Sequence, residues 1–138
     1  MSEAVELHDS AVTAIRHAGS DVVLDMLAIV HSSKGRPGWD PGKTGTQPAT
    51  LVIEDAQIVS SPAGLPLEIL TGRVSVEVQT FENVLLLPFD VAGDVHLELI
   101  GADGTLSVKG RRARLVLRGT WKYLDDVHDV FWAKRRSS

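Results

Sequence analysis

The stretch Val95-His96-Leu97-Glu98-Leu99-Ile100-Gly101-Ala102-Asp103-Gly104-Thr105-Leu106-Ser107-Val108 decides the fold class. Apolar and polar residues alternate in it on both sides of Asp103-Gly104, and a period of two is typical of antiparallel strands with one face in water. An Asp-Gly pair favours a tight type I′ turn, because both central residues of that turn need a positive φ. We therefore predict a β-hairpin whose leucines and valines share one face.

The alternation changes phase just after this hairpin. Apolar residues occupy even-numbered positions up to Val108 and odd-numbered positions from Ala113 onward, and Gly110 lies between the two. A glycine at such a change often marks a β-bulge, which returns the apolar side chains to the core face. We predict a bend at Gly110-Arg111.

Similar patterns recur along the chain. Three denser apolar runs predict strands that are covered on both sides, namely Val22–Val30, Leu51–Ile53 and Val84–Leu87. Residues 10–18 fit a helix or a strand, and their β-branched side chains favour the strand. Turn residues recur about every ten positions, so we predict about eight or nine strands in a single all-β domain spanning 1–138. The fold class is mainly β, a single antiparallel β-barrel or β-sandwich.

The end of the chain has a different pattern. Leu124, Val127 and Phe131 recur at helical spacing, with aspartates at 125–126 and basic residues at 134–136. Negative charge early and positive charge late in a segment suit the helix dipole. The sequence therefore predicts a short C-terminal helix.

Composition excludes several classes of protein. The chain has 138 residues, a net charge of −4 and no cysteine, which excludes disulfide scaffolds, cysteine-ligated metal centres and cysteine nucleophiles. The apolar run Val22–Val30 is interrupted by Asp25 and is too short to cross a membrane. The opening Met1–Glu6 has neither the basic nor the apolar region of a signal peptide. We expect a cytoplasmic protein with no membrane partner and no cofactor.

Charge is distributed unevenly. Residues 1–108 have a net charge of −10, whereas residues 109–138 have a net charge of +6. Basic strands beside aromatic residues can bind nucleic acid, but the whole chain is acidic. We favour a solvent-exposed strand face paired with carboxylates such as Glu98 and Glu77, and we expect no nucleic-acid partner. Three arginines of this strand stay candidates for binding an acidic protein or a carboxylate ligand: Arg112, Arg114 and Arg118.

Residues 32–48 contain four glycines and three prolines and show no apolar period. A long loop of this kind is usually either functional or disordered. Trp39 lies in its middle, where it either anchors a ligand or partner protein with help from Asp40 and Lys43, or folds back over a sheet edge. We therefore name Trp39, Asp40 and Lys43 as candidate binding residues.

No enzymatic motif is convincing. Gly42-Lys43-Thr44 matches the end of a phosphate-binding loop, but Pro37 occupies the position of its first glycine. His8-Asp9-Ser10 contains the residue types of a catalytic triad, although neighbouring side chains on a strand point to opposite faces. The five histidines have no metal-ligand spacing. We predict no catalytic residues and no metal ligands.

Several segments resemble known small proteins. Leu7–Val12, followed by a hairpin through Asp21–Met26, looks like the opening of several families of small bacterial β-proteins, and Asn83–Pro88 and Gly104–Gly110 are similar in style. Many of these proteins are uncharacterised, and some are immunity proteins that neutralise toxins. The resemblance implies a bacterial cytoplasmic β-fold; it implies no activity, cofactor or catalytic residue.

Our leading hypothesis is a non-enzymatic binding domain, similar to an immunity or accessory protein. It would act on a protein partner or form a homodimer through the Trp39 loop or through the basic strand at 111–118. The alternative is a small-ligand carrier with a barrel cavity lined by Met26, Leu97 or Leu117. An enzyme or metal site assembled from distant strands comes third.

Overall fold

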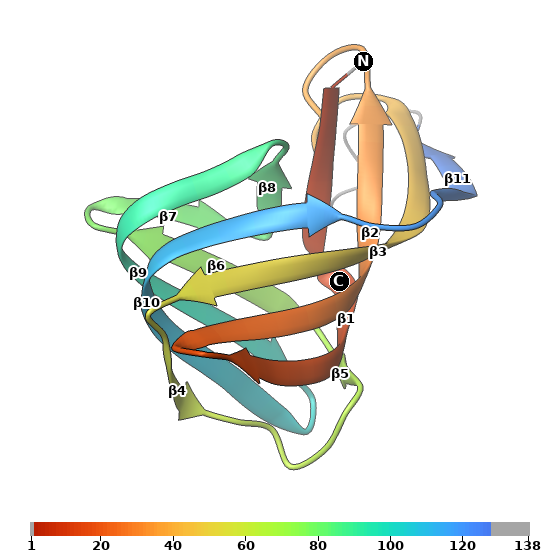
Figure 1. Ribbon diagram of the computed structural model, residues 1–138. Helices are drawn as coiled ribbons and strands as arrows, with labels where there is room; N and C mark the ends of the chain where they lie inside the picture. Colours follow the sequence, from red (N-terminus) through yellow and green to blue (C-terminus); the bar gives the residue numbers. More distant parts are fainter. Residues whose placement is uncertain (1, 128–138) are drawn as a thin grey trace.

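A computed structural model describes residues 2–127, which form eleven strands and no helix. These strands make one antiparallel sheet that curls into an open half-barrel (Figure 1). No helix within residues 2–127 is long and apolar enough to cross a membrane. The mainly β prediction is confirmed, and the extra strands are short segments between residues 57 and 86. The strands are β1 (Ser2–Ala18), β2 (Asp21–Ser33), β3 (Gly42–Glu54), β4 (Gln57–Ser60), β5 (Leu67–Glu68), β6 (Thr71–Val76), β7 (Gln79–Glu82), β8 (Val84–Leu86), β9 (Phe89–Gly101), β10 (Gly104–Leu117) and β11 (Lys122–Val127).

The sheet follows the order β5-β1-β2-β3-β10-β9-β6-β7, with β8 paired to β1, β4 to β10 and β11 to β3. Its concave face holds the core, because alternate side chains of each strand point inward. The leucines and valines of the 95–108 stretch are among these core residues. The largest fully buried apolar side chains are Leu7, Leu24, Leu51, Ile53, Ile69, Leu85, Leu97, Leu99 and Leu106.

The hairpin formed by β9 and β10 has the predicted register. Leu99 lies opposite Leu106 and Leu97 lies opposite Val108. The prediction of a type I′ turn was wrong, because the ladder extends to the pair Gly101 and Gly104 and leaves Ala102-Asp103 as the loop. Asp103 does not have a positive φ. Packing explains the glycine at 101, where a Cβ would lie 2.6 Å from the Leu67 side chain.

The predicted irregularity at Gly110-Arg111 is confirmed. The pairing of β10 with β9 shifts register between Gly110 and Arg112, which places Ala113 and Leu115 in the core together with Val108. A Cβ on Gly110 would lie 2.5 Å from Ile53, so only glycine fits against β3 at this bend.

A second irregularity divides β1 into two halves that run in different directions (Figure 1). The register with β2 shifts between Glu6 and Ala11, and Asp9 has a φ of 74°. The buried hydroxyl of Ser10 donates to the Glu6 carbonyl and accepts the Ile29 N–H. The His8-Asp9-Ser10 motif therefore forms a β-bulge within β1.

The predicted C-terminal helix is wrong for the part of it that the structure describes. Residues 122–127 form β11, which pairs with Gly42–Thr46 of β3, and Leu124 is half exposed. The unpaired edge of β3 explains the difference, because hydrogen bonding to that edge and burial of Val127 outweigh a weak dipole preference. Phe131 and the basic residues at 134–136 lie outside the described residues.

The expected loop at 32–48 is much shorter in the structure. Residues 32–33 end β2, residues 42–48 begin β3, and only residues 34–41 connect the two strands. Of the glycines and prolines that suggested a loop, Gly42, Gly45 and Pro48 lie within β3. A Cβ on Gly45 would lie 2.3 Å from the Trp121 ring, and the Pro48 carbonyl accepts the Arg118 N–H.

The close approach of Trp121 to Gly45 gives a stability prediction. Gly45→Ala should lower the free energy of unfolding by about 1–3 kcal/mol, because the new methyl group must displace the indole. Gly64→Ala is the matched control, since a Cβ there meets nothing within 4 Å. Chemical denaturation of both variants measures the effect. Equal stability of the two would contradict this account of the β3–β11 contact.

Candidate binding site

The loop at 34–41 is folded around the Asp40 carboxylate. Asp40 Oδ2 accepts the Arg36 N–H at 2.6 Å, and the Asp40 and Trp39 N–H groups donate to the Arg36 carbonyl at 2.8 and 3.1 Å. The Arg36 guanidinium lies 3.4 Å from the same carboxylate. These contacts, first the backbone N–H of Arg36 and then its side chain, lower the pKa of Asp40. Asp40 is therefore a structural anchor of the turn.

The inner side of the loop is attached to the end of β2. The Gly38 N–H donates to Nδ1 of His31, and the Ser33 hydroxyl donates to the Pro41 carbonyl at 2.7 Å. His31 and Ser33 have no exposed surface. The loop backbone is thus held at several points, even though it crosses the surface.

Trp39 is positioned by these anchors with 54% of its surface exposed. It lines a cleft of about 290 Å³ together with Pro37, Leu86 and Leu87. Leu86, on β8, is 58% exposed. A second cleft of about 480 Å³ shares Leu87 with the first and continues to residues 115–117 at the end of β10. The two clefts also share Ser2 and Glu3, so the indole and several leucines lie beside polar side chains on one surface, which we call the Trp39 cleft.

The other two loop candidates do not join Trp39 in this cleft. Asp40 is engaged by the backbone and side chain of Arg36. Lys43 lies on β3, with its ammonium 5.9 Å from the centre of the Tyr123 ring. It lines a separate cleft of about 330 Å³ with Lys34 and Asp126.

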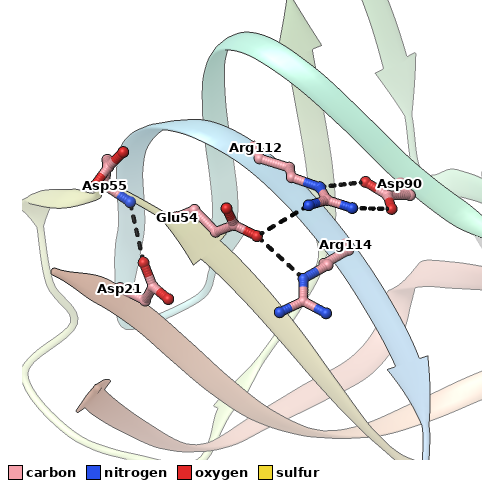
Figure 2. Close-up of polar contacts among 6 residues, drawn as sticks. All are labelled: Asp21, Glu54, Asp55, Asp90, Arg112 and Arg114. Carbon is pink, nitrogen blue, oxygen red and sulfur yellow. Dashed lines mark hydrogen bonds and ion pairs between the residues drawn. The ribbon is translucent and has the colours of Figure 1, made fainter. Parts of the chain in front are cut away.

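The arginines of β10 lie among carboxylates from the neighbouring strands (Figure 2). Arg112 donates to both oxygens of Asp90, at 2.8 and 2.6 Å. Glu54 Oε2 lies 3.5 Å from Arg112 and 3.2 Å from Arg114. Hydrogen bonding to Arg112 lowers the pKa of Asp90, and the same contact raises the pKa of Arg112. We call Glu54, Asp90, Arg112 and Arg114 the ionic stripe.

The expected partners of this strand were only partly right. Carboxylates do face the arginines, but Glu98 pairs with Arg73 on β6 at 3.1 Å, and Glu77 accepts the Asp94 N–H. Arg118 donates to the Thr50 hydroxyl at 3.3 Å. The antiparallel register explains the difference, since it places Ser107 opposite Glu98.

Candidate metal ligands do not cluster within residues 2–127. No group of three or more His, Asp or Glu side chains in that range is arranged to hold a metal ion. Comparisons with protein-family models, curated proteins and solved structures found no match. The candidate site therefore rests on the geometry of this chain alone.

Sequence reasoning missed two parts of the site. Val84–Leu87 was expected to be covered on both sides, but β8 has three residues and only Leu85 of that strand is buried. Leu86 is 58% exposed because neighbouring side chains of a strand point to opposite faces, and Leu85 occupies the core face. The only sequence feature that marks His31 is its position directly after the apolar run of β2. That position does not predict the hydrogen bond from the Gly38 N–H to its ring.

The lowered pKa of Asp40 predicts a pH dependence of the loop. Asp40→Asn should speed amide exchange of Arg36 at neutral pH, because a neutral amide accepts its N–H more weakly than a carboxylate does. The stabilisation exists above the ordinary aspartate range near about pH 4 and is lost as the pH falls through the lowered pKa. At a pH below the pKa of Asp40, the Arg36 amide should exchange at the same rate in the wild type and in Asp40→Asn. A difference that persists there would contradict the role of the charge.

Neutralising the carboxylates of the ionic stripe should create affinity for polyanions. We expect Glu54→Gln combined with Asp90→Asn to elute from heparin at higher salt than the wild type, because Arg112 and Arg114 lose their partners. Glu68→Gln combined with Asp103→Asn makes the same change in net charge away from the stripe and is the control. Equal retention of both variants would show that net charge alone controls the binding.

Proposed function

We propose that this protein is a non-enzymatic binding domain that engages a protein partner through the Trp39 cleft. The observation that carries the proposal is a half-exposed tryptophan on a loop whose backbone is already fixed by Asp40 and His31. Tryptophan is enriched among the residues that dominate binding energies, because burial of its ring removes a large apolar area from water.

Pre-organisation supports a binding role for the loop. A flexible loop loses conformational freedom when it binds, and that loss reduces affinity. Here the turn between Arg36 and Asp40 is hydrogen-bonded in the unbound protein. Ser33 and His31 hold the loop from below. Little ordering is left for a partner to impose.

Charge around the cleft indicates the chemistry of the partner. Arg36 lines the cleft with its side chain 77% exposed, and Glu3 on β1 lines it as well. A partner segment with an apolar side chain beside a carboxylate would place the apolar side chain against Trp39 and Leu86 and the carboxylate near the Arg36 guanidinium. We therefore propose an extended protein segment of that composition as the ligand.

The other functions considered have less support. The arginines at 112 and 114 already have carboxylate partners, which leaves less charge for an external ligand. Of the three residues expected to line a cavity, Met26 and Leu97 are packed in the core, whereas Leu117 lines the part of the Trp39 cleft at the end of β10. This arrangement favours an interaction domain over a small-molecule carrier. Within this proposal, we favour an immunity or accessory role, because the opening sequence resembles that of small bacterial β-proteins, some of which are immunity proteins.

Peptide selection tests the proposal and requires no candidate partner. A random-peptide display library is selected against the wild-type protein and counter-selected against Trp39→Ala. We expect enriched peptides with an apolar residue beside Asp or Glu, whose dissociation constants rise by about tenfold or more in the variant.

Tyr123→Ala is the matched control, because Tyr123 is 55% exposed and Trp39 is 54% exposed. Peptides should bind this variant as they bind the wild type. A library that yields no Trp39-dependent peptide would contradict the proposal. Equal loss of binding in both variants would also contradict it, since the effect would then not be specific to the cleft.

A further inference from the structure

Two ionisable side chains are buried directly beneath the loop. Glu6 on β1 and His31 on β2 each have 0% exposure, and Oε2 of Glu6 lies 3.6 Å from Nδ1 of His31. Both point to the convex side of the sheet, because their strand neighbours Val5 and Val30 belong to the core. The pair therefore lies between the sheet and the loop that carries Trp39.

The hydrogen bond from Gly38 defines the protonation of the ring. Nδ1 of His31 accepts the Gly38 N–H, so it presents a lone pair and carries no proton. The imidazole is therefore neutral in this arrangement, with its hydrogen on Nε2. The same nitrogen that holds the loop is the one that faces Glu6.

We propose that the Glu6–His31 pair is a proton-operated latch on the loop at 34–41. When a proton from solvent binds the Nδ1 lone pair, the ring can no longer accept the Gly38 N–H. The new N–H donates instead to Oε2 of Glu6, which is within reach after a small approach. Gly38 then loses its buried acceptor, and the loop is released from β2.

Charged groups on every neighbouring element bear on this step. The ionisable groups on these elements include Glu6 on β1, and Asp40 and Arg36 on the loop. Lys43 lies next to Thr44 on β3, and the acidic residues of β11 are Asp125 and Asp126.

Gly38 is well placed to transmit the change to the cleft. It has a φ of +90°, and a Cβ there would lie 2.8 Å from Val84, so the chain is closely packed against β8. Trp39 follows immediately in the sequence, and Leu86 lies two residues beyond Val84. Release of Gly38 therefore alters both walls of the Trp39 cleft. The consequence for binding rests on the proposed function, but the latch itself does not.

Nuclear magnetic resonance of the wild-type protein tests the latch directly. Long-range nitrogen–proton spectra should show His31 as the neutral Nε2–H tautomer near neutral pH. On acidification, amide protection of Gly38, corrected for intrinsic exchange, should fall by about tenfold or more as the ring is protonated. A ring that carries a proton on Nδ1 at neutral pH, or Gly38 protection that follows the global stability, would overturn the proposal.

His31→Asn separates the latch from general acid sensitivity. The asparagine carbonyl can stand near the position of Nδ1 and accept the Gly38 N–H, but it does not titrate. We expect this variant to keep Gly38 protected throughout the pH range. Glu6→Gln replaces the carboxyl group that would accept the new Nδ1–H, so the loss of Gly38 protection should be smaller at a given acidic pH. If His31→Asn fails to fold, the tautomer and protection measurements on the wild type still decide the question.

His17→Asn is the control, since His17 is exposed on β1 and its replacement should leave the release of Gly38 unchanged. The two proposals fail separately. Peptide binding that does not depend on Trp39, together with pH-dependent release of Gly38, would refute the function and leave the latch. Trp39-dependent binding with Gly38 equally protected at both ends of the pH range would refute the latch alone.

Discussion

The ladder between β2 and β3 is the contact on which the rest of the structure depends. It runs without a register shift from the pair Val22 and Ile53 to the pair Ser33 and Gly42. Because an antiparallel ladder fixes which residues share a face, this one register places alternate residues of both strands in the core, such as Val22, Leu24 and Leu51. The same register places His31 on the opposite face. At the end of the ladder, the short connection at 34–41 carries Trp39.

The two faces of this sheet have different chemistry. The concave face is a packed apolar core, whereas the convex face of β3 and β10 is covered by the ionic stripe. Each exposed pair of this kind contributes less than about 1 kcal/mol, so the stripe adds little to folding stability. Its main effects are on solubility and strand register, because the arginines of a basic strand are paired with carboxylates of neighbouring strands.

Sequence patterns predicted the parts of the fold that depend on alternation. The β9–β10 register, the irregularity at Gly110 and the choice of strand over helix for residues 10–18 follow from which positions are apolar. Three expectations were wrong for a common reason: the type I′ turn, the loop at 42–48 and the helix that begins near Leu124. In each case contact with a distant segment outweighed a local preference, as when Trp121 packs on Gly45.

The candidate site divides in the same way. The sequence by itself identified Trp39, because the surrounding residues have the composition of a loop. It also placed the arginines of β10 on a solvent-exposed strand face, because apolar and basic residues alternate there. Only the tertiary structure decided that Asp40 folds the loop, that Lys43 lies apart, and that Glu6 and His31 meet beneath Gly38. Those contacts join residues from separate strands. Their geometry is set by the curl of the sheet, which no local pattern encodes.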